Sequence, residues 1–229
     1  MSNRPIDVIV PVYNEEAVLD EFYRRLSALP VPIHAIFIDN ASTDSSLSII
    51  KSFPDVSVIE HSRNEGYGAS LRDGIRSATS DRVVIIDADC EYPPEAIPEM
   101  VHRLERCEVI YASRFLEKQQ TKMPRLKVLG NKTITGLFNV LFNQQLTDLY
   151  TGAKAFRRSA VAELPLELDG FEHVLEFAAR LSRAGVRIEE LHVTFQPRWT
   201  GTSKMSHLQE TVKYCYFLLF YFFTLKKMT

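Results

Sequence analysis

Residues 83–91 read VVIIDADCE, an apolar run followed at once by alternating acidic side chains. The first four residues are typical of a buried strand. Asp87 and Asp89 then stand two residues apart at the end of that strand, where their carboxylates can direct oxygen ligands at one point, and Glu91 follows two residues later. Hard oxygen ligands suit Mg²⁺ or Mn²⁺, which usually bind substrate phosphates as well. The stretch therefore predicts a metal site that handles a diphosphate.

Similar apolar runs alternate with helical patterns through the first half of the chain. We expect strands at 6–10, 35–39, 56–60, 83–86 and near 109–111, and helices from near the capping residue Asn14, after Ser42-Thr43-Asp44, after the turn 64–68 and over about 94–106. This order predicts an α/β fold with a mostly parallel sheet covered by helices on both faces. Ligands bind beyond the carboxyl ends of the strands in such sheets, so we expect Tyr13, Glu15, Asp39, Asp87 and Asp89 at one edge.

The composition excludes several classes of protein. The chain has 229 residues, of which 45% are hydrophobic and 24% charged, which indicates a globular protein with one sizeable core. The formal net charge of −2 gives no reason to expect nucleic acid as a partner. Cys90, Cys107 and Cys215 are widely spaced, which indicates neither a disulfide framework nor a zinc site. Together with the lack of a recognisable signal peptide, this predicts a cytoplasmic location.

Motifs of other enzyme classes are absent. Gly66-Tyr67-Gly68 lacks the third glycine of GxGxxG and follows the third expected strand, which argues against a dinucleotide-dependent oxidoreductase. Neither the P-loop nor the GxSxG motif of hydrolases occurs. The six histidines lack HExxH spacing, so we expect them on the surface or in satisfied core positions.

The second half of the chain combines positive charge with apolar residues. Between 114 and 132, six basic residues stand against Glu117 alone, which leaves +5: Arg114, Lys118, Lys122, Arg125, Lys127 and Lys132. Ile134, Leu137, Phe138, Leu141 and Phe142 then follow with helical spacing. A basic segment beside an apolar face suits an anionic membrane surface or an amphiphilic phosphate. The alternative is an ordinary core helix with a solvated basic approach.

The run 214–225 is apolar, rich in aromatic residues and flanked by lysines. A bilayer span needs about 20 apolar residues, so this run is short. We expect a domain of residues 1–210, in which 114–145 forms the acceptor and membrane-interface segment, followed by a hydrophobic interfacial helix over 211–229. The alternative for the last segment is a core helix.

Several motifs resemble those of family 2 glycosyltransferases of the GT-A fold. They are VPVYNEE at 10–16, FIDNASTD at 37–44 and DAD at 87–89. A narrower similarity, to the dolichol-phosphate mannosyltransferase and polyprenyl-phosphate glycosyltransferase group, rests on DADCEYPPE at 87–95, SRF at 113–115, DLYTGAKAF at 148–156 and RWTGTSK at 198–204. The resemblance covers roughly residues 5–210. The chain departs from the family pattern at Asn40, Glu91 and Lys154, where the family often has Asp, Gln and Arg.

The resemblance also implies roles for individual residues. Those that would bind the nucleotide sugar are Pro11, Tyr13, Glu15, Asp39, Asp44, Gly66, Gly68, Asp87 and Ala88. The metal would be held mainly by Asp89 and Glu91, with Asp87 nearer the ribose or the metal. Phosphates would be contacted by Arg114, Arg125, Arg198 and Lys204, of which Arg114 and Arg125 would meet the acceptor phosphate.

Some of these residues have simpler alternative roles. Asp44 fits the N-terminus of a helix, and Gly66 and Gly68 fit a tight turn. Asp148 would act as a base toward a hydroxyl acceptor, or would orient the acceptor where this is already ionised. Glu176 is a weaker candidate, since a carboxylate on a helix face is usually solvated. The expected catalytic set is Asp89, Asp148, Arg114, Arg198 and Lys204.

These observations predict an inverting glycosyltransferase that depends on Mg²⁺ or Mn²⁺. It would move a hexose from a donor of the GDP-mannose or UDP-glucose type to dolichyl or undecaprenyl phosphate at the cytoplasmic membrane face, as a peripheral protein with a possible anchoring partner. The same donor site would also suit a saccharide acceptor in surface polysaccharide assembly, in which case Asp148 becomes an essential base. A non-catalytic nucleotide-sugar-binding or scaffold protein is the third hypothesis, and the intact acidic motif argues against it.

Overall fold

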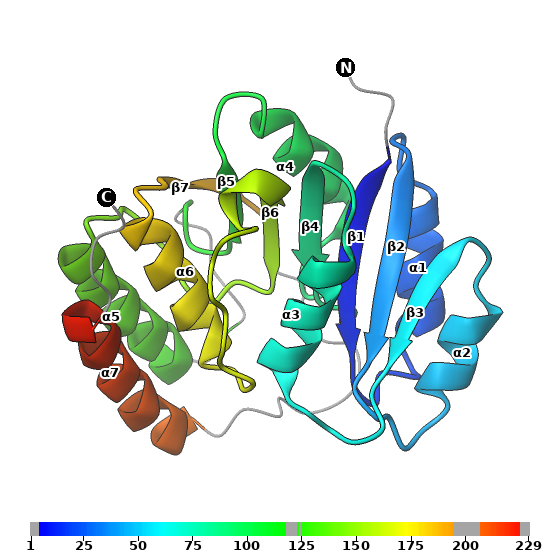
Figure 1. The fold of residues 1–229 in the computed structure, drawn as a ribbon, viewed down its shortest axis with the longest axis horizontal. Coiled ribbons are helices and arrows are strands. Elements are labelled where there is room, and N and C mark those ends of the chain that lie inside the picture. Colours follow the sequence, from blue (N-terminus) through cyan, green and yellow to red (C-terminus); the bar gives the residue numbers. More distant parts are fainter. Residues whose placement is uncertain (1–4, 118–122, 124, 195–206, 225–229) are drawn as a thin grey trace.

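A computed structural model describes residues 5–117, 123, 125–194 and 207–224. In this part of the chain a seven-stranded sheet has the order β3-β2-β1-β4-β6-β5-β7 (Figure 1). The strands are β1 (Ile6–Val12), β2 (Ile33–Asp39), β3 (Val56–Glu60), β4 (Arg82–Ile86), β5 (Val109–Ser113), β6 (Ala153–Arg157) and β7 (Ile188–His192).

The sheet is parallel except at β6. β1 pairs with β2 from Ile6 opposite Ile33 to Val12 opposite Asp39, while β6 runs antiparallel to both β4 and β5. The predicted mostly parallel sheet is therefore confirmed, whereas β6 and β7 were not expected from the sequence. Because Ala153 pairs with Ile86, the segment that precedes β6 arrives at the carboxyl end of β4, beside the acidic motif.

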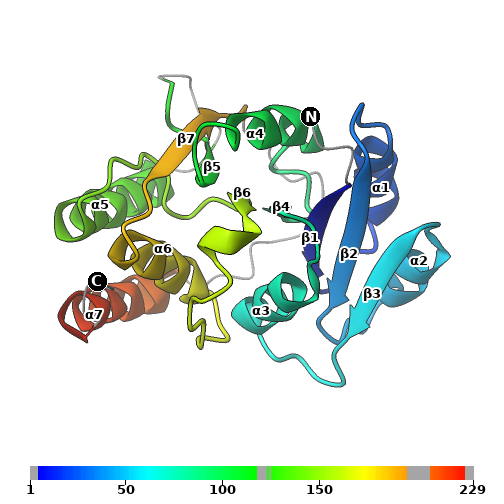
Figure 2. The same ribbon diagram turned by 45° about the horizontal axis from the view of Figure 1, so that its top comes forward.

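Helices cover both faces of the sheet (Figures 1 and 2). They are α1 (Leu19–Ser27), α2 (Ser46–Ser52), α3 (Tyr67–Ser77), α4 (Ile97–Arg103), α5 (Arg125–Phe142), α6 (His173–Arg183) and α7 (His207–Thr224), with short 3₁₀ turns η1 (Pro94–Ala96) and η2 (Arg158–Ala160). The alternation of strand side chains divides the core. Val8 and Val84 pack toward α1, α2 and α4, whereas Ile9 and Ile85 pack toward α3, α5 and α6.

The first helix begins later than expected. α1 starts at Leu19 and buries Leu19, Phe22 and Leu26 on one face, so the predicted apolar stripe is confirmed. Asn14 does not cap it, because Asn14 has φ of 53° and its side-chain oxygen accepts the backbone N–H of Thr43 from the loop after β2. Asn14, which the sequence suggested as a helix cap, thus joins the loop after β1 to the loop after β2.

The apolar stripe of α5 is largely part of the core. Ile134, Phe138 and Phe142 are buried in the cluster between the sheet, α6 and α7. The prediction that this apolar face meets a membrane surface or an amphiphilic phosphate is therefore wrong for these residues, and the alternative of a core helix holds for them. The large hydrophobic side chains that the described part of α5 exposes to solvent are Leu129, Leu137 and Val140.

α7 packs beside α5 and α6 at one end of the sheet (Figures 1 and 2). It buries Tyr214, Leu218 and Tyr221 and leaves large apolar side chains exposed at Tyr216, Leu219, Phe220 and Phe223. Of the helices that the structure describes, none combines the length and hydropathy that crossing a membrane requires.

Candidate active site

The loops that follow β1, β2 and β4 meet at the carboxyl edge of the sheet, at the bottom of Figure 1. The first two loops are joined by hydrogen bonds. The backbone N–H groups of Asn14 and Glu15 donate to the hydroxyls of Ser42 and Ser46, at 3.0 and 2.8 Å. Pro11, Tyr13 and Glu15 are half-buried at this edge, and their contact with a nucleoside stays a prediction.

Asp44 has both carboxylate oxygens engaged within the protein. Oδ1 accepts the N–H of Ser46, the first residue of α2, at 2.9 Å, and Oδ2 accepts the N–H of Glu16 at 3.2 Å. Burial would raise the pKa of Asp44, but these hydrogen bonds outweigh burial and lower the pKa. The geometry supports the alternative role at a helix N-terminus, and contact with a nucleotide stays a prediction.

Asp39 presents an unsatisfied acceptor at the end of β2. Its carboxylate is buried, and Oδ2 accepts the N–H of Ser42 at 3.1 Å. Oδ1 is also buried and has no hydrogen-bond partner among the described residues. A buried polar atom left unpaired costs about 1–3 kcal/mol. This oxygen is therefore suited to a ligand that brings its own donor, such as a ribose hydroxyl or the N–H group of a base.

The first residue of the acidic motif, Asp87, is held by contacts from two directions. The hydroxyl of Tyr67 donates to Asp87 Oδ1 at 2.9 Å, and a Cβ added to Gly152 would lie 2.1 Å from Asp87 Oδ2. Burial and the charge of Asp87 raise the pKa of Tyr67 well above its ordinary value, so the hydroxyl stays protonated and donates. Gly152 is thus required by the close approach of the segment before β6.

Asp89 and Glu91 are placed by a sharp turn between them. Cys90 has φ of 57°, in the left-handed region, and the N–H of Glu91 donates to Asp89 Oδ1 at 2.9 Å. Asp89 is buried and Glu91 half-buried, while the side chain of Ala88 is buried in the core. Carboxylate oxygens that follow one another at a strand end are hard ligands of the kind that Mg²⁺ or Mn²⁺ prefers.

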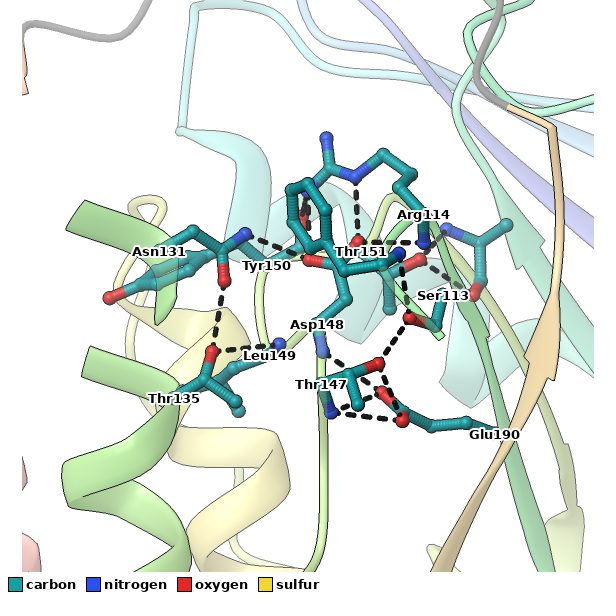
Figure 3. Close-up of polar contacts among 12 residues, drawn as sticks. Ser113, Arg114, Asn131, Thr135, Thr147, Asp148, Leu149, Tyr150, Thr151 and Glu190 are labelled. Atoms are coloured by element: carbon teal, nitrogen blue, oxygen red, sulfur yellow. Dashed lines mark hydrogen bonds and ion pairs between the residues drawn. The ribbon is translucent and has the colours of Figure 1, made fainter. Parts of the chain in front are cut away.

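Asp148 and Arg114 form a buried bidentate ion pair (Figure 3). Arg114 Nε lies 2.6 Å from Asp148 Oδ2, and Nη2 lies 2.9 Å from Oδ1. Asn131 Nδ2 donates to the same Oδ1 at 2.8 Å, and the side chain of Asp148 is 0% exposed. Burial would raise the pKa of Asp148, but Arg114 and Asn131 outweigh burial and lower it. Asp148 therefore has little capacity to act as a base and instead positions Arg114.

A second, half-buried carboxylate holds the backbone next to this pair. Glu190 of β7 accepts the N–H groups of Thr147 and Asp148 at 2.8 and 2.9 Å, together with the Thr147 hydroxyl (Figure 3). Burial raises the pKa of Glu190. On the other side, Thr135 joins Asn131 to the N–H of Leu149. These contacts tie the 147–149 segment to β7 and α5.

Lys154 is a buried cation that links the two halves of the site. Its Nζ donates to the carbonyl oxygen of Thr151 at 2.5 Å and lies over the ring of Tyr111. Burial lowers the pKa of Lys154 to about 8, although the nearby charges of Asp87 and Asp148 act in the opposite direction. Lys154, at a position where the family often has Arg, therefore lies near the carboxylates of both Asp87 and Asp148.

Other predicted residues are placed differently or are not described. Arg198 and Lys204 lie outside the described residues, and Arg125 is the first residue of α5, with a side chain outside the described part. A Cβ on Gly66 or Gly68 would lie 2.2 Å from a carbonyl oxygen of the 168–169 backbone, so these glycines permit two backbones to approach. Their contact with a nucleotide stays a prediction.

Glu176 was expected to be solvated, and this expectation is wrong. Its side chain is fully buried, accepts the backbone N–H groups of Glu167 and Leu168, and pairs with Arg180 at 2.9 Å. Burial would raise the pKa of Glu176, but the neighbouring groups, with His173 first and then the backbone N–H groups of Leu168 and Glu167, lower it to about 2. The carboxylate anchors the loop before α6.

Four residues of the site were not predicted from the sequence: Tyr67, Asn131, Lys154 as a charge link, and Glu190. The sequence did contain a signal for Tyr67. It lies between Gly66 and Gly68, in the turn that follows β3 at the edge of the sheet. Glu190 and Asn131 carry no local signal, since their partners are about 40 and 17 residues away in the chain.

The sequence and the fold both have known relatives. The family described as "Glycosyl transferase family 2" matches residues 7–164. An uncharacterized glycosyltransferase of Mycobacterium tuberculosis is 27% identical over 206 residues, which cover 90% of this chain and 92% of that protein.

Two relatives with named activities are longer than this chain. An undecaprenyl-phosphate 4-deoxy-4-formamido-L-arabinose transferase of Pectobacterium atrosepticum is 27% identical over 213 residues, which cover 89% of this chain and 63% of that protein. A dolichol-phosphate mannosyltransferase of Pyrococcus furiosus is 25% identical over 210 residues, which cover 87% and 59%. The chain thus spans less than two thirds of the length of either protein.

A solved structure shares the fold. Glucosyl-3-phosphoglycerate synthase from Mycobacterium tuberculosis in complex with UDP superposes with a TM-score of 0.74 at 20% identity, covering 97% of this chain and 82% of that chain. The same enzyme has been solved with Mn²⁺, UDP and phosphoglyceric acid. At this level of identity the likeness establishes the GT-A type of architecture.

Proposed function

The chain belongs to glycosyl transferase family 2, and we propose that it moves a hexose from a nucleotide-diphosphate sugar to a polyprenyl phosphate, with inversion at the anomeric carbon. The sugar is of the mannose or glucose type, and the reaction takes place at the cytoplasmic face of a membrane. The acceptor phosphate attacks the anomeric carbon from the side opposite the nucleotide.

The buried, unsatisfied Oδ1 of Asp39 is the observation that carries the donor half of this proposal. It lies at the same sheet edge as the acidic motif, so a nucleoside bonded to Asp39 directs its diphosphate toward Asp89 and Glu91. These two carboxylates would hold Mg²⁺ or Mn²⁺, which when bound supplies positive charge that stabilises the leaving diphosphate. Tyr67 keeps the neighbouring Asp87 in place.

The Asp148–Arg114 pair supports a phosphate acceptor. A saccharide hydroxyl must lose a proton as it attacks, and Asp148 is buried, fully hydrogen-bonded and low in pKa. An acceptor phosphate is already ionised and needs no base. Arg114 lies over the ring of Tyr92, directly after Glu91, where its charge serves to receive an anionic acceptor. The two named relatives act on undecaprenyl phosphate and dolichol phosphate, according to their names.

The exposed apolar residues of α5 and α7 provide the contact with the membrane in this proposal. Val140 and Phe223 are 82% and 78% exposed, and the neighbouring 114–132 segment is rich in Lys and Arg. Large apolar side chains beside basic residues suit the surface of an anionic bilayer. Sedimentation with vesicles of anionic and neutral lipid tests this. Replacing both residues by Ser should reduce binding to anionic vesicles, while Gln145→Ser, at an exposed position just after α5, should not.

The decisive experiment for the reaction offers a panel of nucleotide sugars and a short polyprenyl phosphate with Mg²⁺ or Mn²⁺. The expected result is a sugar-linked lipid phosphate with one preferred donor. Equal turnover of a phosphate-free acceptor would contradict the proposed acceptor and favour the saccharide alternative, in which Asp148→Asn abolishes turnover. No turnover or hydrolysis of any nucleotide sugar would favour a non-catalytic binding protein.

A further inference from the structure

Three potential metal ligands meet away from the acidic motif, at the connection between β3 and α3. His61 directly follows β3, Glu65 lies in the turn, and Asp73 lies on α3. One ligand atom from each of the three lies within 4.8 Å of the other two. The spacing of these residues in the sequence gave no indication of a metal site, because the turn and one face of a helix bring them together.

The orientation of His61 is fixed by Asn40. The amide oxygen of Asn40 accepts the backbone N–H of Glu65 at 2.8 Å, which identifies this atom as the oxygen. His61 Nδ1 lies 3.0 Å from the same oxygen and therefore donates its proton to it. A metal-binding histidine usually donates its second ring N–H to an oxygen in this way, which fixes the ring and directs the other nitrogen at the metal.

His61 Nε2 faces Asp73 without a hydrogen bond. The side chain of His61 is 6% exposed, and Nε2 is buried without a hydrogen-bond partner among the described residues. Asp73 Oδ2 is 3.3 Å from Nε2, but it lies off the direction in which a proton on Nε2 would point. Two ligands of a tetrahedral Zn²⁺, each about 2.0–2.1 Å from the ion, are separated by about 3.3 Å. The separation is therefore that of two ligands of one ion.

We propose that His61, Asp73 and Glu65 bind a Zn²⁺-type ion, at a site separate from the acidic motif of residues 87–91. Imidazole nitrogen favours Zn²⁺ over Mg²⁺, and three protein ligands leave one position for water. The exposed carboxylate of Glu65 moves in to complete the set. Arg63 and Arg76 lie 3.9 and 3.5 Å from these carboxylates, but their side chains are 85% and 70% exposed and can turn into solvent.

Such an ion would join the loop after β3 to α3 and, through Asn40, to the segment that carries Asp39. Asn40 also donates to Asn64 at 3.1 Å, so His61, Asn64 and Glu65 all depend on one side chain next to the proposed nucleoside contact. The site therefore goes beyond the proposed transfer reaction: it stabilises an edge of the donor site without touching the reacting atoms.

Titration of the full-length, EDTA-treated protein with Co²⁺ and then Zn²⁺, in excess Mg²⁺ to fill the hard oxygen sites, tests the proposal. We expect one equivalent of Co²⁺ with the visible absorption of a tetrahedral site, displaced by Zn²⁺, and a rise in melting temperature with Zn²⁺. His61→Gln and Asp73→Asn should each weaken binding at least about tenfold. Asp89→Asn should keep the site, as should His102→Gln, which alters an exposed histidine 3.7 Å from Glu105.

Two results would overturn the proposal. If the wild-type protein and both ligand variants bind Co²⁺ equally, the metal is held elsewhere. If the wild-type protein shows no stoichiometric binding and no gain in melting temperature, the His61–Asp73 contact is an ion pair of a protonated histidine. Asp73→Asn keeps the test valid should His61→Gln fail to fold, because Asp73 lies on the surface of α3.

Discussion

The two halves of the candidate site differ in how their charged side chains are paired. On the donor side, formed by the loops after β1, β2 and β4, Asp39 keeps a buried oxygen that has no partner in the described part of the chain, and several carboxylates follow a single strand. On the acceptor side, the charges of Asp148 and Arg114 are satisfied by one another. The first arrangement is costly until a ligand arrives, and the second is rigid from the start. In the proposed reaction, the donor half is therefore built for binding and the acceptor half for positioning.

The strongest test of this contrast replaces Asp89 by Asn. Transfer should fall by about 10³-fold or more, because loss of the charge stabilisation of a bound metal costs several kcal/mol in the transition state. The melting temperature should stay the same or rise, since one of several neighbouring negative charges is removed. Formation of lipid-linked product and thermal unfolding measure the two effects. Asp81→Asn, at the exposed position just before β4, is the control and should leave both unchanged.

On the acceptor side, removal of a carboxylate should instead lower the stability of the protein. Asp148→Ala leaves the guanidinium of Arg114 buried without its partner, which should destabilise the protein by about 3–5 kcal/mol. Replacing both residues by apolar ones should cost less than the sum of the single changes, as urea unfolding would show. Glu21→Ala removes an equally bidentate but exposed pair with Arg24 and should leave the stability almost unchanged.

A stable Asp148→Ala variant that has lost all turnover would reverse this assignment. Asp148 would then act directly on the acceptor, and the two halves of the site would not differ in kind.

The buried pair of Glu176 and Arg180 extends the contrast to pH. The pKa of Glu176 is about 2 in the folded protein, against an ordinary 4.5, so the folded state binds fewer protons than the unfolded state between these values. Its contribution, about 3 kcal/mol by linkage, should be complete above pH 4.5 and lost as pH falls toward 2. Urea unfolding of wild type and Glu176→Gln between pH 7 and 3 should show the difference in stability shrinking as pH falls.

The exposed pair of Glu99 and Arg103 supplies the matched control, because it has the same spacing on a helix and the same distance of 2.9 Å. Glu99→Gln should cost less than about 1 kcal/mol at any pH. An equal effect of the two variants would show that burial does not set the strength of the Glu176 pair.

The same contrast explains what the sequence could and could not predict. Strand ends of a parallel sheet meet at one edge, so Asp39, Asp87 and Asp89 were brought together by local patterns alone. Asp148 and Glu190 depend on β6 running antiparallel and on β7 joining the sheet beyond it, and nothing local encodes either event. The burial of Ile134 and Phe138 could not be predicted for the same reason. Periodicity shows which side chains share a helix face, but it does not show what covers that face.

Two glycines provide the smallest and most local test. In Gly68→Ala the new Cβ would lie 2.2 Å from the carbonyl oxygen of Leu168, where the N-terminus of α3 packs against the loop before α6. Backbone on both sides cannot yield easily, so the change should destabilise the protein by about 1–3 kcal/mol. In Gly136→Ala, on the exposed face of α5, no described residue lies within 4 Å of the new Cβ, and the helix should gain up to about 1 kcal/mol.

The changes in melting temperature of the two variants should have opposite signs if this packing, and not contact with a nucleotide, is the reason for a glycine at position 68. Binding of a nucleoside diphosphate separates the two roles. A Gly68→Ala variant with unchanged stability but lost binding would return this glycine to the nucleotide, as the resemblance to the family implied. A variant that is less stable but binds normally once folded would show that Gly68 serves the contact between α3 and the 168–170 loop, which holds Tyr67 against Asp87.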